Sequence, residues 1–167
     1  MDTNTKKTAL RMFPYGLYVL TAGTRDGKIA GATVTWVTQA SFEPPRVLVC
    51  VKPDSYIHTV IEEAQSFALN ILGKGQASLA YTFFKSTGRE GNTLSGEPFT
   101  EGFTGSPILD NTTAFVECRL VESIKAGDHT VFIGEVVEAG VRKPHVGRPD
   151  EATLWLKDLG EKLFYGG

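Results

Sequence analysis

The chain has 167 residues and a net charge of -2, with 41% hydrophobic and 22% charged residues. This length and composition predict a single globular domain over residues 1–167 with a sizeable core. A nearly neutral chain has no basic field to hold nucleic acid or an anionic membrane, so we expect a small molecule or another protein as partner.

The opening residues do not resemble an export signal. The segment MDTNTKKTALRMFPYG lacks the apolar core of a signal peptide, and no apolar run reaches the length of a membrane span. We therefore expect a cytoplasmic protein. Cys50 and Cys118 lie in apolar runs and are expected to be reduced core thiols, although the sequence leaves a disulfide between them open.

The first part of the chain alternates between helix and strand patterns. Residues 5–13 predict a short helix that ends near Pro14, and residues 15–24 predict a strand. An Asp-Gly turn at 25–28 then leads into one returning strand over 29–40. After Pro44 and Pro45, the apolar run at 46–52 predicts a strand that is buried on both faces.

The second part adds two helices and at least three strands. Residues 55–65 predict a helix with Ser55 as N-cap, and residues 66–72 predict a strand. A second helix is expected over 76–84, followed by a long loop over 85–110 and a hairpin over 112–143 that turns at Ala126-Gly127-Asp128. Six or seven strands joined by hairpins predict a closed or partly closed antiparallel barrel with flanking helices.

Several familiar catalytic patterns are missing from the sequence. The run Gly73-Lys74-Gly75-Gln76 lacks the endings of both nucleotide-binding glycine loops, and there is no GxSxG elbow. Three dispersed histidines do not form a zinc set, and the carboxylates show no metal-site spacing. What remains is the stretch GATVTWVTQASFEPP over 31–45, which is rich in hydroxyl groups.

This stretch has the groups that a flavin requires. Thr33, Thr35, Thr38 and Ser41 offer small polar groups for a ribityl chain, and the surrounding backbone offers donors to the ring. Lys52 and Ser55, ahead of the helix, offer a site for a phosphate. An edge strand whose threonines face solvent explains the same residues equally well.

A second group of candidates lies at Gly127-Asp128-His129. It is either an exposed hairpin turn or an opening where His129 donates to a bound pyridine nucleotide. His58 is expected on a helix surface, with a secondary role near the phosphate. Trp36 is expected in the core or at a subunit contact, and the apolar tail Leu163-Phe164-Tyr165 is expected to dock on the body or on a partner subunit.

Together these residues resemble the flavin reductase-like, FMN-binding split-barrel proteins over nearly the whole chain. The motifs are FPYGLYVLTA, GATVTWVTQASFEPPRVLVCVKPDSYIHTVI, FALNIL, AGDHTVFIGEV and LFYGG. The resemblance implies a mainly β, Greek-key-like split barrel with flanking helices that forms a homodimer. It also implies His129 as the catalytic residue near the nicotinamide, and cofactor contacts from Thr33, Val34, Thr35, Trp36, Thr38, Gln39, Ala40, Ser41, Lys52, Ser55, Tyr56, His58, Gly127, Asp128 and Tyr165.

The resemblance implies a flavin reductase that passes hydride from NADH or NADPH to FMN. The electrons then go to a free flavin or to a protein acceptor such as a monooxygenase. We expect FMN rather than FAD because no clear adenine pocket can be recognised in the sequence. The sequence favours neither NADH nor NADPH. Two alternatives stay open: an FMN-binding electron-transfer module without NAD(P)H activity, and a related split barrel that binds another ligand.

Overall fold

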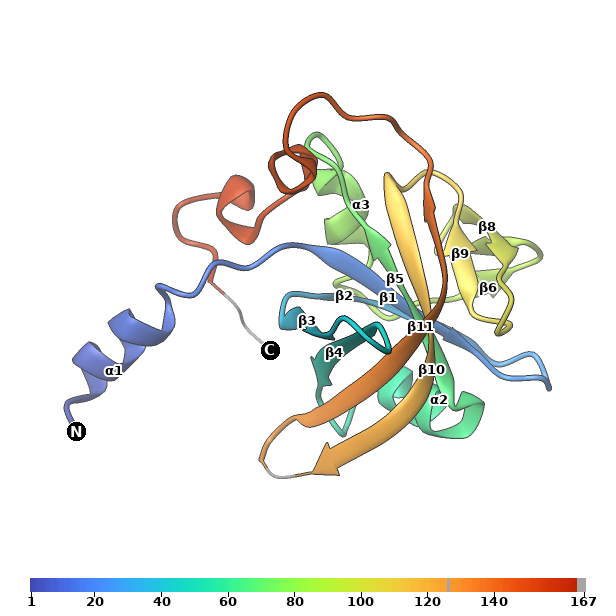
Figure 1. The fold of residues 1–167 in the computed structure, drawn as a ribbon, viewed down its shortest axis with the longest axis horizontal. Coiled ribbons are helices and arrows are strands. Elements are labelled where there is room, and N and C mark those ends of the chain that lie inside the picture. The colour runs from blue at the N-terminus through green and yellow to red at the C-terminus, as the bar shows by residue number, and fades with distance from the viewer. Residues whose placement is uncertain (126, 165–167) are drawn as a thin grey trace.

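The computed structural model describes residues 1–125 and 127–164 and is mainly β, with antiparallel sheets and few helices (Figure 1). The helices are α1 (Thr3–Leu10), α2 (Tyr56–Ala64) and α3 (Ala77–Thr82), with 3-10 turns at Pro149–Ala152 and Leu156–Leu159. The strands are β1 (Tyr18–Gly23), β2 (Ile29–Val34), β3 (Val37–Ser41), β4 (Arg46–Val51), β5 (Ser66–Ile71), β6 (Arg89–Glu90), β7 (Thr93–Leu94), β8 (Glu97–Glu101), β9 (Pro107–Leu109), β10 (Ala114–Lys125) and β11 (Thr130–Val141).

The main sheet has seven antiparallel strands in the order β2-β1-β5-β10-β11-β4-β3. Its two edge strands, β2 and β3, are consecutive in the chain, and only Thr35 and Trp36 separate them. The single strand predicted over 29–40 is therefore wrong. The Val37 N–H donates to the Thr35 carbonyl over 3.1 Å and closes a three-residue turn. At this turn the chain leaves β2, at one edge of the sheet, and enters β3, at the other edge.

β4 is less buried than its apolar sequence predicts. Val49 and Val51 are buried, but Val47, Leu48 and Cys50 are only half-buried. Val47 lies on one face of β4, and Leu48 and Cys50 lie on the other, so neither face is fully covered. Cys50 lines an open cavity, and β4 is the second strand from the sheet edge, next to β3. The cysteines are both free, as predicted.

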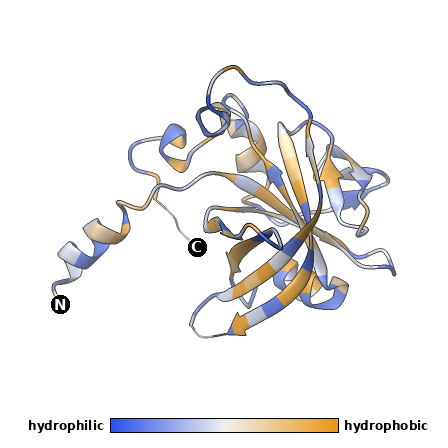
Figure 2. Cartoon of the chain, in the orientation of Figure 1, coloured by the Kyte–Doolittle hydropathy of each residue, from blue (hydrophilic) through white to orange (hydrophobic). Residues whose placement is uncertain are grey.

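Two hydrophobic clusters form the core. In one, Val60 and Ile61 of α2 pack with Leu20, Phe67 and Phe132 of the main sheet. The other gathers residues from β1, α3, the C-terminal segment and a small second sheet. Figure 2 shows the apolar residues concentrated along the strands. The apolar stripe predicted for α2 is confirmed at Ile57, Val60 and Ile61.

The small second sheet corrects the long loop predicted over 85–110. Its four strands run in the order β6-β7-β8-β9. Buried polar side chains of the main sheet hold it: Glu117 accepts from the Phe103 N–H over 2.9 Å, and Asn70 accepts from the Leu109 N–H over 2.9 Å. These partners are distant in sequence, so the local Gly-rich and Ser-rich composition does not reveal the strands.

The stretch between α1 and β1 lies beside the C-terminal segment (Figure 1). α1 begins at the N-cap Asp2 and buries none of its residues. The C-terminal segment pairs with the stretch before β1: the Leu17 N–H donates to the Leu154 carbonyl, and the Leu156 N–H donates to the Tyr15 carbonyl, each over 2.9 Å. Across the described ranges, no helix is long and apolar enough to span a membrane.

Candidate functional site

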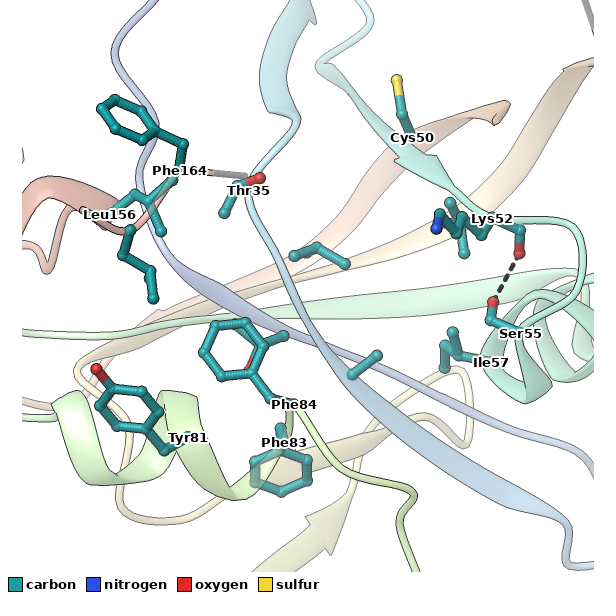
Figure 3. Close-up of a pocket in the computed structure, with 15 residues that line it drawn as sticks. Thr35, Cys50, Lys52, Ser55, Ile57, Tyr81, Phe83, Phe84, Leu156 and Phe164 are labelled. Atoms are coloured by element: carbon teal, nitrogen blue, oxygen red, sulfur yellow. Dashed lines mark hydrogen bonds between the residues drawn. The ribbon is translucent and has the colours of Figure 1, made fainter. Parts of the chain in front are cut away.

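A cavity of about 540 Å³, the main cavity, opens between β2, β4, the start of α2, α3 and the C-terminal segment (Figure 3). This volume suits a small-molecule ligand. Side chains from five separate parts of the chain line it: Ala32, Thr33, Val34, Thr35, Cys50, Val51, Lys52, Ser55, Ile57, Tyr81, Phe83, Phe84, Leu156, Leu163 and Phe164.

The hydroxyl groups of the two threonines on the cavity wall differ in their hydrogen bonds. The Thr33 hydroxyl donates to the Ala80 carbonyl over 2.7 Å, so it ties β2 to α3. The Thr35 hydroxyl is buried and has no hydrogen-bond partner within the described part of the chain. A buried polar group without a partner carries a desolvation cost that a ligand can remove. Thr35 is therefore a candidate for a polar contact with an occupant.

One end of the cavity, the polar end, is formed by Lys52 and Ser55 (Figure 3). Ser55 takes the predicted N-cap position of α2, but its hydroxyl donates to the Lys52 carbonyl over 2.7 Å and caps no helix N–H. None of the ion pairs found within residues 1–125 and 127–164 includes Lys52. A lysine outside these ion pairs, beside a helix N-terminus without a side-chain cap, favours an anion.

The opposite end, the aromatic end, is apolar. Tyr81 and Phe84 have ring centroids 5.8 Å apart, and Leu156 and Phe164 come from the C-terminal segment. Sequence reasoning assigned none of these residues a role in binding. Tyr81, in α3, and Phe84, just after it, are exposed in the structure, and no pattern in the sequence distinguishes them from core aromatic residues.

The predicted docking of the tail is confirmed for Leu163 and Phe164, which line the main cavity. The Arg11 guanidinium lies over the Phe164 ring, 3.9 Å from its centroid. Tyr165, the tail residue predicted to contact the flavin, lies outside the described residues.

The Gly127-Asp128-His129 turn lies beside the polar end but does not line the cavity. Thr130 of β11 pairs with Val51 of β4 in antiparallel register. His129, which precedes Thr130, therefore lies next to Lys52, which follows Val51. His129 is buried, 4.7 Å from the Trp36 ring between centroids, and its Nδ1 lies 2.9 Å from Asp128 Oδ1. The His129 hydrogen bond, together with nearby Lys52, lowers the pKa of Asp128. Ala126 of the predicted turn is outside the described residues.

His58 is buried, which corrects the helix-surface position expected for it. Its Nε2 lies 2.8 Å from the Thr130 hydroxyl, and its Nδ1 lies 3.5 Å from Glu62, which also pairs with Lys125. Burial lowers the pKa of His58, with a smaller opposing effect from Glu62. His58 thus joins α2 to the β10–β11 hairpin and does not line the main cavity.

The remaining predicted contacts lie outside the cavity. Thr38, Gln39 and Ala40 are exposed on the edge strand β3, and Ser41 follows a bulge. Tyr56 is exposed at the start of α2. The cavity therefore brings together Thr33, Val34, Thr35, Lys52 and Ser55, and leaves out Trp36, Thr38, Gln39, Ala40, Ser41, Tyr56, His58, Gly127, Asp128 and His129. In the part of the chain that the structure describes, no group of His, Cys, Asp and Glu could hold a metal ion.

Comparisons with known proteins give this cavity a family. The model of the flavin reductase like domain matches residues 10–158. The reductase component of a 4-nitrophenol 4-monooxygenase from Rhodococcus opacus is 37% identical over 127 residues, which are 76% of this chain and 66% of that protein. The flavin reductase (NADH) of Kitasatospora aureofaciens is 33% identical over 150 residues, 89% of this chain and 77% of that protein.

A solved structure shares the fold. The NADH:FAD oxidoreductase SgcE6 of Streptomyces globisporus C-1027, in complex with NAD and FAD fragments, has a TM-score of 0.74 and 26% identity. The likeness covers 99% of this chain and 96% of that chain. By its family-model match and by its relatives, the chain belongs to the flavin reductase-like domain family.

Proposed function

We propose that the protein is an NAD(P)H:flavin oxidoreductase that binds FMN in the main cavity and supplies electrons to a free flavin or to an oxygenase partner. Relatives named as an NADH-dependent flavin reductase and as the reductase component of a monooxygenase support this reaction. The observation that carries the proposal is the cavity itself. It has a cation at a helix N-terminus without a side-chain cap, a wall with a hydroxyl that no described residue partners, and an aromatic end.

The polar end fits a phosphate. Lys52 supplies a positive charge, and the first N–H groups of α2 supply donors that no side chain caps. Charge-assisted hydrogen bonds of this kind are stronger than neutral ones. Ser55 contributes through its backbone position, since its hydroxyl is already bonded to the Lys52 carbonyl.

The middle and the aromatic end fit a ribityl chain and a flat ring. The Thr35 hydroxyl is the one polar group on this wall that has no partner among the described residues and would gain one from a ligand. Tyr81, Phe83 and Phe84 offer the apolar surface against which a ring packs. FMN is favoured over FAD because these two ends match a mononucleotide.

A flavin held by Lys52, the first turn of α2 and Thr35 would supply the acceptor for a hydride from NAD(P)H. The protein's share of the catalysis is to hold the cofactor, to orient the donor and to keep water away. His129, packed against Trp36 and hydrogen-bonded to Asp128, lies beside the polar end and away from the aromatic end proposed for the ring, so its contact with the nicotinamide stays a prediction from the resemblance. Contacts from Thr38, Gln39, Ala40, Ser41, Tyr56 and Tyr165 stay predictions.

The assembly is also a proposal. We infer a homodimer of split barrels, each formed from one domain, because the apolar residues Met12, Phe13 and Phe42 are 75%, 62% and 87% exposed. Such apolar surface is typical of a protein interface. The cytoplasmic location stays a prediction from the sequence.

The first test is a visible absorbance spectrum of the purified protein with FMN, followed by anaerobic addition of NADH and then of NADPH. Bleaching of the flavin colour by either nucleotide is expected, and the faster one identifies the donor. Flavin that binds but stays yellow with both nucleotides would instead support an electron-transfer module. Failure to bind any flavin would leave a split barrel for another ligand.

A further inference from the structure

A cavity of about 710 Å³, the hairpin cavity, opens between the β1–β2 turn, the C-terminal end of α2, the loop from β8 to β9, and β10. Its lining shares no residue with that of the main cavity. The main cavity meets the start of α2, whereas the hairpin cavity meets its last residues, so the helix lies between them. Figure 1 shows the β1–β2 turn on the side of the molecule away from α1. A ligand in the hairpin cavity therefore leaves the main cavity free.

Two kinds of contact hold the walls of the hairpin cavity. The buried Glu117 carboxylate accepts from the Phe103 N–H over 2.9 Å and anchors the loop from β8 to β9. At the surface, the Lys28 ammonium lies 2.6 Å from Glu63 and 3.9 Å from Asp26, so it joins the β1–β2 turn to α2. Glu63 and Asp26 both line the cavity, and Lys28 offsets part of their negative charge.

Two arginines line the hairpin cavity from different walls. Arg25 comes from the β1–β2 turn, and Arg119 comes from β10. Both are exposed, and neither takes part in an ion pair within residues 1–125 and 127–164. Glu135, the cross-strand neighbour of Arg119, forms none with it either. The planar guanidinium groups suit the two oxygens of a carboxylate.

A buried hydroxyl and an exposed ring lie beside Arg119. Ser66 is directly opposite Arg119 in the antiparallel pairing of β5 with β10. Ser66 is 4% exposed, and its hydroxyl has no hydrogen-bond partner among the described residues, so a ligand oxygen would relieve its desolvation cost. The Arg119 guanidinium carbon lies 5.5 Å from the centroid of the Phe103 ring, which is 70% exposed.

The short separation of this ring and this cation selects the ligand. A flat ring that packs on Phe103 brings its anionic group to Arg119 only if that group is attached directly to the ring. An aromatic carboxylate meets this condition. A nucleotide does not, because its ribose separates the base from the phosphate.

We propose that the hairpin cavity is a binding site for a small aromatic carboxylate. Arg25 and Arg119 would hold its oxygens, the Ser66 hydroxyl would donate to one of them, and Phe103 would pack against its ring. The proposal does not rest on the proposed function, because none of these four residues lines the main cavity.

The test uses 2-naphthoate as probe, titrated by calorimetry into the full chain with and without saturating FMN. The wild type is expected to bind it with the same dissociation constant in both conditions. The double variant Arg25→Gln/Arg119→Gln should raise this constant at least tenfold, and Phe103→Ala should raise it several-fold. 2-Naphthamide, which keeps the ring but lacks the charge, should bind the wild type at least tenfold more weakly.

Arg148→Gln is the matched control, because Arg148 is an exposed arginine that lines neither the hairpin cavity nor the main cavity. A double variant that binds 2-naphthoate as tightly as Arg148→Gln does would overturn the proposal. Displacement of 2-naphthoate by FMN would overturn it too, because the probe would then lie in the main cavity. Inorganic phosphate that competes with equal affinity would also overturn it, because the ring would contribute nothing.

Ser66→Ala distinguishes a formed site from two surface arginines. Its unfolding midpoint in urea should not fall, because the lost hydroxyl has no partner among the described residues, but 2-naphthoate should bind several-fold more weakly. Undiminished affinity in Ser66→Ala would contradict the hydrogen bond.

The same titrations separate this proposal from the flavin site. Binding of 2-naphthoate that the double variant loses would support the hairpin cavity even if FMN did not bind. Absence of 2-naphthoate binding, beside normal binding of FMN, would overturn the hairpin cavity alone.

Discussion

Lys52 and Ser55 close one end of the main cavity, whereas Tyr81, Phe84 and Phe164 close the other. The polar end comes from four consecutive residues and the helix start that follows them. The aromatic end is assembled from α3 and a C-terminal segment that lies more than seventy residues later in the chain. The polar end should therefore discriminate by charge, and the aromatic end by contact area.

Of these variants, Lys52→Ala at the polar end should change the affinity for FMN the most. Loss of a charge-assisted contact costs about 1.5–3 kcal/mol, so FMN should bind roughly ten- to a hundredfold more weakly. Riboflavin, which lacks the phosphate, should bind nearly as before. Fluorescence titration with both ligands measures this. Lys74→Ala, at an exposed lysine outside the cavity, is the control. Equal losses for FMN and riboflavin would remove the phosphate from the polar end.

At the aromatic end, Phe84→Ala should weaken FMN and riboflavin by the same factor. An aromatic pair contributes about 0.5–1.5 kcal/mol beyond its buried area, which is roughly a two- to tenfold change in affinity. The same titrations apply, with Phe103→Ala as the control at an exposed phenylalanine outside the cavity. A loss confined to FMN would show that the two ends do not divide the ligand as proposed.

Thr35→Val tests the wall between the ends. Without ligand, the variant should be more stable by about 1 kcal/mol, because it removes a buried hydroxyl that has no partner among the described residues. With flavin, affinity should fall several-fold, because the ligand loses that partner. Urea unfolding with and without FMN measures both effects. Thr38→Val, on exposed β3, should change neither, and a destabilised Thr35→Val would contradict the assignment.

The smallest effect should be the pH dependence contributed by His58. Burial lowers its pKa in the folded state, so the unfolded chain binds this proton more tightly. The stability contribution is complete above pH 6.5, the ordinary value, and falls as the pH drops from 6.5 through the lowered pKa. His58→Gln should flatten this part of the curve of free energy of unfolding against pH. Glu62, whose pKa Lys125 lowers, titrates at more acid pH. An unchanged slope in His58→Gln would contradict a buried neutral imidazole.

The sequence predicted the elements whose signals are local. The strand at 66–72 and the helix after Ser55 have clear apolar patterns, and both are present. The break at Thr35 and Trp36 was not predictable, because β-branched residues continue across it. What decides the break is pairing with β1 on one side and with β4 on the other.

The site residues divide in the same way, into those with a local sequence signal and those without one. Thr33, Thr35, Lys52 and Ser55 belong to one continuous motif, and the cavity gathers all four. Phe84 was missed because its sequence neighbourhood has no binding pattern, and Phe164, in the LFYGG motif, was predicted only to dock. The two residues come to line one cavity through the tertiary packing of α3 and the C-terminal segment. The long segment at 85–110 forms strands for a related reason, since Glu117 and Asn70 anchor it from far away in the sequence.

The two cysteines differ in accessibility, and this difference has a practical consequence. Cys50 is half-buried and lines the main cavity, whereas Cys118 is fully buried, and burial together with nearby Glu117 raises its pKa to about 12. A thiol-specific reagent will therefore meet one accessible group in each folded chain. The labelling rate of Cys50, followed by mass spectrometry, is a gauge of cavity occupancy that needs neither colour nor turnover.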